Sequence, residues 1–326
     1  MSHMTYPEAI VVGFIQGVTE LFPVSSLGHN VLIPALIGGS WAADLSVSAT
    51  TSPYLAFIVG LHVATAIGIM VYFWRDWVRI IAGFLTSIRD RDIRTPDQKL
   101  AWMLIVATIP VGLAGLVFEN EFRVLFAKPV RAGIFLIING LILFAGERFR
   151  TKRSRLADIE ASQQRDAVES GITRTSSVHA GGQRAARLDE IQLAEEADQR
   201  LAQRSYVEAV VIGAAQILAL LAGISRDGVT MVAGMFGGLS REDAARFAFL
   251  LATPVILAAG VLKAGDLISY GKGDYGPILA GSILSGLGAY ISVRFLVKYF
   301  RTRTLTPFAI YCVLFGIGSV VYLSVK

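Results

Sequence analysis

The sequence is poor in cysteine, histidine and charge, and each shortage excludes a kind of protein or site. Its single cysteine, Cys312, cannot form an intrachain disulfide or a cysteine-rich metal site. The chain has only four histidines, which argues against a site built from several imidazoles. Charged residues make up 17% of the chain, against roughly 25% in an ordinary soluble domain, whereas 54% of the residues are hydrophobic. This composition excludes a disordered or fibrous protein and argues against a soluble enzyme.

Acidic residues are the scarcer charge, and the formal net charge of the chain is +5. A basic balance is typical of proteins that bind nucleic acid, but membrane proteins carry the same excess in their cytoplasmic loops. Because the chain is so hydrophobic, we favour the second interpretation and expect no nucleic-acid partner.

Six stretches approach the roughly 20 apolar residues that a membrane-crossing helix needs. They are residues 54–73, 100–118, 132–146, 247–262, 277–297 and 305–325. Two further apolar segments, 7–22 and 207–222, are too short to span, and a polar turn separates each from a second short run, at 31–37 and 231–236. We expect re-entrant helical hairpins over 7–37 and 207–236, because broken membrane segments persist only where protein or water satisfies their backbone.

Lysine and arginine predict the orientation. They concentrate in the segments 74–99, 147–204 and 298–304, which the positive-inside rule assigns to the cytoplasm, and they are sparse in 119–130 and 263–276, which it assigns to the outside. Residues 149–204 mix both signs of charge around a Ser/Thr/Gly-rich middle. We interpret them as a hydrophilic cytoplasmic insert or linker, in which His179 is simply exposed.

An internal repeat organises the chain. Residues 6–30 and 206–230 align without a gap, and nine positions are identical, including Gln16/Gln216, Ser25/Ser225 and Gly28/Gly228. Each half then holds one re-entrant unit and three spans, so the second half must insert upside down. We predict an all-α integral membrane protein with an inverted-topology repeat, in which 1–148 and 205–326 are the two repeats.

The polar residues of the repeated segments are the candidates for chemistry, because charged groups at membrane depth are costly and usually functional. If the two loops meet at the midplane, Glu20, His29 and Arg226 share one polar cavity. Arg226 is a permanently charged fork that suits phosphate oxygens. The turns also place hydroxyls and free backbone N–H groups at broken helix ends, which attract anions. The phosphate-binding candidates are Ser25, Gly28, Ser225, Gly228 and Thr230.

A nucleophile and a base stand close together in the first segment. Ser26 offers a nucleophilic oxygen, and His29 lies three residues further on. Gln16 and Glu20 share one helix face, where a carboxylate can hold a divalent cation against phosphate oxygens. This set matches the needs of phosphoryl transfer, although a structural Glu20–Arg226 ion pair is the alternative. His62, in the middle of an apolar span, is expected to pack or to face a pore rather than to catalyse.

These segments resemble the motifs of the undecaprenyl-diphosphate phosphatase family, also called the bacitracin-resistance protein family. The first motif stands here as QGVTELFPVSSLGH at 16–29, and the second as GISRDGVT at 223–230. The resemblance covers nearly the whole chain apart from 149–204. The sequence departs from the family pattern at Ala222, where proline is usual, at Asp227, where serine is usual, and at Leu27, where a small or hydroxyl residue is usual.

The resemblance implies a phosphatase of the bacterial plasma membrane, with a site that opens to the extracytoplasmic side. Such enzymes hydrolyse undecaprenyl diphosphate to undecaprenyl phosphate and inorganic phosphate, recycle the lipid carrier of cell-wall synthesis, and underlie bacitracin resistance. Carried over by motif position, the essential group is Glu20, Ser26, His29 and Arg226. A divalent cation, Mg²⁺ or Ca²⁺, is implied, with Glu20 and Gln16 as its ligands. Whether Ser26 attacks phosphorus or His29 activates water stays open.

A transporter is the alternative from another class. A flippase for undecaprenyl phosphate or a related anionic lipid could use the same inverted repeat and cavity. The set of Glu20, Ser26 and His29 favours the enzyme, because binding alone needs no nucleophile and base. The expected partners are the isoprenyl diphosphate lipid and the bilayer, and a homodimer is left open.

Overall fold

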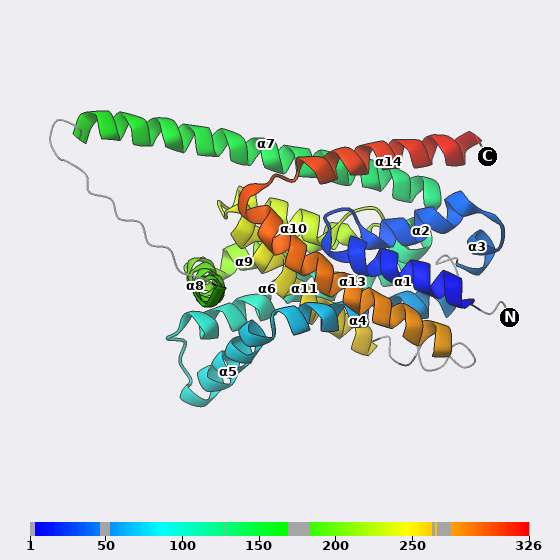
Figure 1. Ribbon diagram of the computed structural model, residues 1–326, viewed down its shortest axis with the longest axis horizontal. Coiled ribbons are helices and arrows are strands. Elements are labelled where there is room, and N and C mark those ends of the chain that lie inside the picture. The colour runs from blue at the N-terminus through cyan, green and yellow to red at the C-terminus, as the bar shows by residue number, and fades with distance from the viewer. Residues whose placement is uncertain are drawn as a thin grey trace.

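The computed structural model describes residues 4–45, 53–126, 128–168, 183–262, 265 and 275–325. Over these residues the chain forms only helices and the turns between them (Figure 1). The predicted all-α class is therefore confirmed. His179 and most of the predicted outer loop 263–276 lie outside the described residues.

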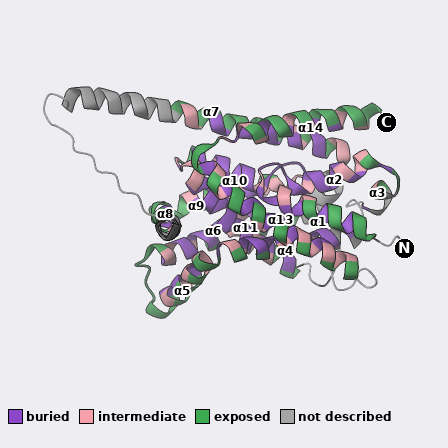
Figure 2. Ribbon diagram, viewed as in Figure 1, coloured by how far each residue is buried: buried purple, intermediate pink, exposed green. Residues whose placement is uncertain are grey.

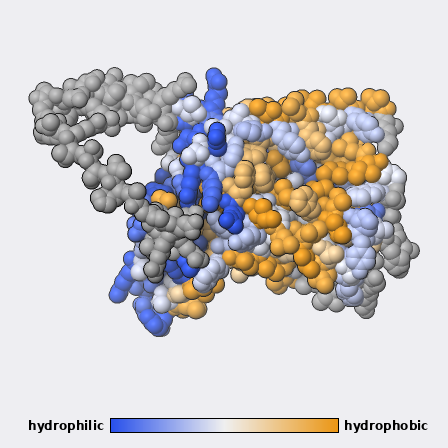
Figure 3. Space-filling model, in the orientation of Figure 1, coloured by the Kyte–Doolittle hydropathy of each residue, from blue (hydrophilic) through white to orange (hydrophobic). Residues whose placement is uncertain are grey.

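Five of the described helices are long and apolar enough to cross a membrane. The N-terminal portions of α6 (Pro96–Phe126) and α7 (Pro129–Val168) qualify, as do α11 (Arg241–Leu262), α13 (Tyr275–Thr302) and α14 (Thr306–Val325). Helix α4 (Pro53–Tyr72) adds a sixth candidate span if it is counted together with the helix that follows it. On the face that Figure 3 shows, apolar residues form a broad band, as expected of an integral membrane protein.

The segment 74–99, predicted as a loop, is largely the helix α5 (Trp74–Asp90). It turns by 90° from the preceding helix α4. Val78, Ile81, Leu85 and Ile88 are exposed at helical spacing along one of its faces. A basic amphipathic helix of this kind is typical of the membrane interface, where it lies parallel to the bilayer plane. The many arginines of the segment do not by themselves predict this helix.

The two short apolar segments begin in the same way. Helix α1 (Tyr6–Leu21) starts with a capping box between Thr5 and Glu8, and α9 (Tyr206–Ala214) starts with one between Ser205 and Glu208. In both, the cap hydroxyl and the glutamate satisfy backbone N–H groups that the first turn leaves free. The first segment continues into α2 (Ser26–Ile37) and α3 (Gly39–Asp44), and the second into η1 (Ala215–Leu220) and α10 (Arg226–Phe236).

The halves of the chain pack on each other through glycines. A Cβ on Gly13 of α1 would lie 2.2 Å from the carbonyl oxygen of Gly281 on α13. A Cβ on Gly213 of α9 would lie 2.0 Å from the carbonyl oxygen of Ala107 on α6. Each short helix thus contacts a long helix of the other half so closely that no side chain fits between them. Figure 1 also shows α7 and α14 lying side by side.

The end of the hydrophilic insert packs against the membrane helices. In α8 (Gln183–Ala202), Asp198 is 1% exposed and binds Arg79 of α5 and Arg246 of α11 at 2.8 Å each. Arg200 binds Asp243 of α11 at 2.8 Å. Buried residues concentrate in the centre of the helical bundle, and the outer surfaces of α13 and α14 are exposed (Figure 2).

Candidate active site

The two motif segments meet inside the bundle. Ser25 adopts a φ of 67°, and its hydroxyl accepts hydrogen bonds from the N–H of Gly28 and, at 3.2 Å, from the N–H of Gly223. A Cβ on Gly28 would lie 2.9 Å from the Cα of Gly223. The positive φ of a non-glycine residue stores strain, and here it orients a hydroxyl that joins the first loop to the second.

A buried amide from a third helix fixes the same junction. Asn139 of α7 is 0% exposed. Its Oδ1 accepts from the N–H of Ser225 at 2.9 Å, and its Nδ2 donates to the carbonyl of Pro23 at 2.9 Å. Because Ser225 begins α10 and Pro23 precedes α2, one side chain binds both loops. Asn139 was not predicted from the sequence, because it stands alone in an apolar span.

Glu20 is the centre of the site. It lies near the end of α1, is 7% exposed, and contacts both segments. Its Oε1 accepts from Nη2 of Arg226 at 2.5 Å, and its Oε2 accepts from Nε2 of Gln16 at 2.8 Å and from the hydroxyl of Ser26. The predicted juxtaposition of Glu20 and Arg226, 206 positions apart, is present.

Arg226 and Asp227 occupy the first turn of α10. Asp227 is 1% exposed, and neither of its carboxylate oxygens has a hydrogen-bond partner. Nε of Arg226 is also without a partner and lies 3.7 Å from Oδ1 of Asp227. The guanidinium thus keeps one buried donor that no hydrogen bond among the described residues uses. Thr230 donates its hydroxyl hydrogen to the Arg226 carbonyl at 2.7 Å, so it stabilises the turn that carries the guanidinium.

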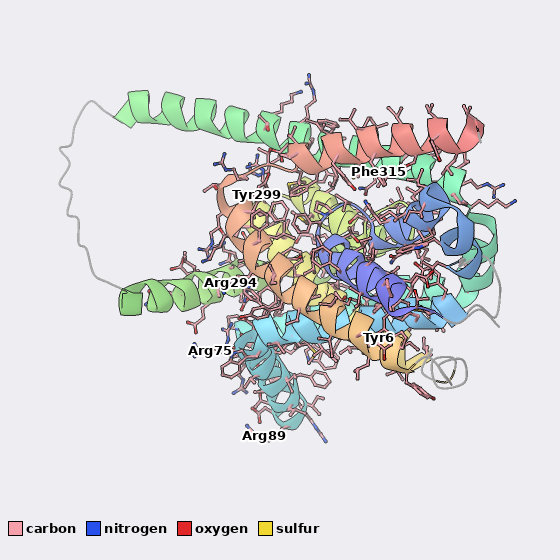
Figure 4. The ribbon with its side chains drawn as sticks, turned by 45° about the vertical axis from the view of Figure 1, so that its right-hand side comes forward. Tyr6, Arg75, Arg89, Arg294, Tyr299 and Phe315 are labelled. Carbon is pink, nitrogen blue, oxygen red and sulfur yellow. The ribbon has the colours of Figure 1, made fainter. Side chains whose placement is uncertain are left out.

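Both ring nitrogens of His29 have hydrogen-bond partners, and neither partner is Glu20. Its Nδ1 lies 2.7 Å from the carbonyl oxygen of Ser25, and its Nε2 lies 2.7 Å from the hydroxyl of Tyr311 on α14. The ring of Phe315, labelled in Figure 4, stacks on it with a centroid distance of 5.2 Å. The candidate nucleophile Ser26 donates its hydroxyl hydrogen to the carboxylate of Glu20 and not to the candidate base His29.

His62 is the histidine that contacts Glu20. Its Nε2 lies 3.2 Å from Oε2 of Glu20, and its Nδ1 lies 2.8 Å from the carbonyl of Ile58. Acceptors face both ring nitrogens, which fits a doubly protonated imidazole. From the sequence, His62 was predicted to pack or to face a pore. The residue that would have revealed its role, Glu20, lies 42 positions away on another helix.

The donor arrangement does not fit a resident divalent cation on Glu20 and Gln16. Both oxygens of Glu20 already accept from cationic or neutral donors. The amide oxygen of Gln16 accepts from Asn30 at 2.6 Å. Divalent cations of this kind require several free oxygen ligands. The described residues contain no group of three or more His, Cys, Asp or Glu side chains placed to hold a metal.

The remaining predicted residues hold the loops in shape. The hydroxyl of Ser225 caps α10 by accepting from the N–H of Gly228 at 3.1 Å. Gln216, the repeat partner of Gln16, is buried and donates to the carbonyl of Gly213 at 3.4 Å. The two halves therefore have the same loop caps and a glutamine at the same repeat position. Only the first half places a carboxylate four residues after that glutamine, because Leu220 occupies the position of Glu20 in the second half.

Comparison with known proteins identifies the family to which the chain belongs. The model of the family described as bacitracin resistance protein BacA matches residues 9–318. An undecaprenyl-diphosphatase of Mycolicibacterium paratuberculosis is 56% identical over 100% of this chain and 99% of its own length. Undecaprenyl-diphosphatase 2 of Frankia alni is 52% identical over 97% of each chain, and that of Chromobacterium violaceum is 38% identical over 97% of this chain and 98% of its own. The chain therefore belongs to the bacitracin resistance protein BacA family.

Proposed function

We propose that this membrane protein is an undecaprenyl-diphosphate phosphatase. It hydrolyses the lipid diphosphate to undecaprenyl phosphate and inorganic phosphate, and so returns the carrier to cell-wall synthesis. Membership of the BacA family and full-length similarity to proteins named undecaprenyl-diphosphatase support this function. The observation that carries the proposal on the structural side is the contact of Arg226 and Ser26 with one carboxylate, that of Glu20.

Substrate binding begins with an exchange of partners at Arg226. The guanidinium holds Glu20 through one nitrogen, and its Nε is unused. A diphosphate that reaches this point competes with Glu20 for the guanidinium, because phosphate oxygens form strong, paired hydrogen bonds with arginine. The first turns of α2 and α10 add backbone N–H groups, which favour anions at helix N-termini.

Phosphoryl transfer then proceeds from Ser26. Its Oγ attacks the terminal phosphorus, the bond to the bridging oxygen breaks, and undecaprenyl phosphate leaves with that oxygen. The hydroxyl proton passes to Glu20, which already accepts it in a hydrogen bond. Water then attacks the phosphoserine, which releases inorganic phosphate and restores Ser26. His62 offsets the charge on Glu20. Direct attack by water that His29 activates is the other route.

Replacement of Ser26 separates these routes. Ser26→Ala removes the nucleophile, and we expect phosphate release to fall by about 10³-fold or more, the order seen when nucleophiles are deleted. After an acid quench with substrate labelled at the terminal phosphate, the wild type should retain label on the protein and the variant should not. Ser319→Ala, which removes a buried hydroxyl without a partner, is the matched control. Turnover near that of the wild type in Ser26→Ala would exclude the serine route.

The topology remains part of the proposal. We propose that α1–α2 and α9–α10 are re-entrant hairpins of an inverted repeat, and that the site opens to the extracytoplasmic side. The matched capping boxes at Glu8 and Glu208 and the loop contact at Gly28 and Gly223 support the repeat. The sidedness rests on the Lys/Arg distribution. A cysteine introduced at Tyr6, which is exposed at the start of α1, and labelled from one side of intact cells tests it.

The flippase for undecaprenyl phosphate stays the second candidate, because a lipid phosphatase and a lipid carrier both need an anion site within the bilayer. Phosphate release in detergent, measured beside lipid translocation in liposomes, distinguishes them. The divalent cation, Mg²⁺ or Ca²⁺, also stays a prediction, since the residues as placed do not form its site. Loss of activity on chelation, restored by either ion, would support it.

A further inference from the structure

A second charged cavity lies at the polar end of the bundle, and none of the candidate active-site residues lines it. It has a volume of about 430 Å³ and is enclosed by the corner between α4 and α5 together with α8, α11 and α13. Six of its lining side chains are basic, and two are acidic. The cavity therefore carries an excess of positive charge that the proposed phosphatase reaction does not use.

The inner wall of this cavity is internally neutralised. Arg79 and Arg246 share two acids: both bind Asp76 and Asp198 at 2.7–2.8 Å. Arg246 also lies over the ring of Phe73, 5.5 Å from its centroid. This network ties α5, α8 and α11 together. It forms a rigid wall rather than a site for a ligand, because its charges are already paired.

Two arginines of the outer wall have no acidic partner among the residues that the structure describes. Arg75 stacks over Trp74 at 5.2 Å from the ring centroid, and Arg294 projects from α13. Both side chains are exposed, and neither forms an ion pair with any residue that the structure describes. Figure 4 shows them on the same side of the molecule, where α5, α8 and α13 come together. Two exposed guanidinium groups around one cavity favour an anionic ligand with phosphate oxygens.

The depth of the cavity indicates the source of that phosphate. Helix α5 turns by 90° from α4 and exposes an apolar face, which places it in the membrane interface. Trp74 and Arg75, in its first turn, then lie at the level of the lipid headgroups, where tryptophan is enriched. Val71 and Val297, which are apolar, line the same cavity. A ligand with a phosphate and an acyl chain matches both walls.

We propose that this cavity binds the phosphodiester headgroup of an anionic glycerophospholipid, with Arg75 and Arg294 on the phosphate oxygens and Val71 and Val297 along the first acyl carbons. Basic cavities between membrane helices recognise such headgroups. A bound lipid would join α5 to α13 and so hold the corner at the end of α4, the helix that carries His62. The site is distinct from the diphosphate site in its residues and in its depth in the membrane.

The test measures the binding of short-chain phosphatidylglycerol to the purified full-length protein in detergent, by the rise in melting temperature as lipid is added. The wild type should be stabilised by phosphatidylglycerol and not by phosphatidylcholine. In Arg75→Gln/Arg294→Gln the apparent Kd should weaken by about tenfold or more, while the melting temperature without lipid stays unchanged. Arg294→Gln alone provides a second variant, because that exposed side chain contributes no ion pair to the fold.

Matched controls decide where the lipid binds. Arg89→Gln/Arg91→Gln removes the same charge from the far end of α5 and should shift the Kd by less than twofold. Arg226→Gln, in the candidate active site, should retain the wild-type affinity. An equal loss in either control, or no preference for phosphatidylglycerol, would overturn the proposal. Stabilisation by glycerol 3-phosphate at the same concentrations would assign the cavity to a soluble anion and would also overturn it.

Discussion

Asp227 is one of the three positions at which the sequence departs from the motif that it resembles, and its surroundings make this departure consequential. Its carboxylate is buried, both oxygens lack partners, and the nearest cation is Nε of Arg226 at 3.7 Å. A buried polar group without a partner costs about 1–3 kcal/mol, and a charged one costs more. The negative charge also opposes the binding of an anion at Arg226. We therefore expect Asp227 to reduce both the stability of the fold and its affinity for phosphate.

Asp227→Ser should reverse both effects. We expect a higher melting temperature in detergent and a KM for undecaprenyl diphosphate that is about three- to tenfold lower, because a unit charge a few ångströms away at an effective dielectric of about 20 acts with a few kcal/mol at most. Steady-state phosphate release measures KM. Asp243→Ser, which removes a buried carboxylate on α11 that is paired with Arg200, should instead lower the melting temperature. A raised KM in Asp227→Ser would show that Asp227 orients Arg226.

Site residues that belong to a sequence motif could be predicted from the sequence. Site residues that come together only through folding could not. Glu20, Ser26 and Arg226 stand out because polar groups are rare in apolar segments. His62 and Asn139 are just as polar, yet each is single in its helix, and a lone polar residue in a span more often packs than reacts. Their partners come from other helices, at separations that no spacing pattern records.

At the scale of helices, α7 does more than cross the membrane. Through Asn139 it binds the start of α10 and the turn before α2, so it sets the distance between Ser26 and Arg226. The predicted span 132–146 is extended in the structure to the window Pro129–Lys152. Its length could be estimated from hydropathy, whereas its contact with both loops depends on which face of the helix turns inward.

Asn139→Leu should therefore lower both stability and turnover. It leaves the N–H of Ser225 and the carbonyl of Pro23 without a strong partner, at about 1–3 kcal/mol for each buried group. A loop displaced by about 1 Å can reduce catalysis by about 100-fold. We expect a lower melting temperature and a fall of that order in kcat, measured by phosphate release. Ser319→Ala on the facing helix α14 should change neither quantity, and a wild-type kcat in Asn139→Leu would show that the loops are held without it.

The helix α5 shows the opposite limit of sequence analysis. Its arginines predict a cytoplasmic loop, and its apolar residues, taken alone, are too scattered to suggest a span. Only when they are placed on a helix do Val78, Ile81, Leu85 and Ile88 form one face. In the structure this segment and residues of the other basic segments line the cavity described above. The positive-inside rule groups these segments together, but it does not indicate that this one is a helix.

Over the whole molecule, the two halves are interlocked rather than adjacent. Helix α1 packs on α13, α9 packs on α6, and α14 lies along α7. The candidate site is also built from both halves, since Glu20 and Ser26 come from the first half and Arg226 comes from the second. Most of the close glycine contacts join one half to the other, so we expect that neither half is stable alone.

This arrangement makes covalent continuity between the halves dispensable and their contact indispensable. We expect residues 1–168 and 183–326, expressed together as two chains, to assemble and to release phosphate from undecaprenyl diphosphate at a rate within about tenfold of the intact protein. The close glycine contacts, rather than the intervening residues, provide the interface. Each fragment alone should be inactive, and Arg226→Gln in the second fragment should abolish the activity of the pair. Activity in the first fragment alone would show that Arg226 is not part of the site, because Glu20, Ser26 and His29 would then suffice without it.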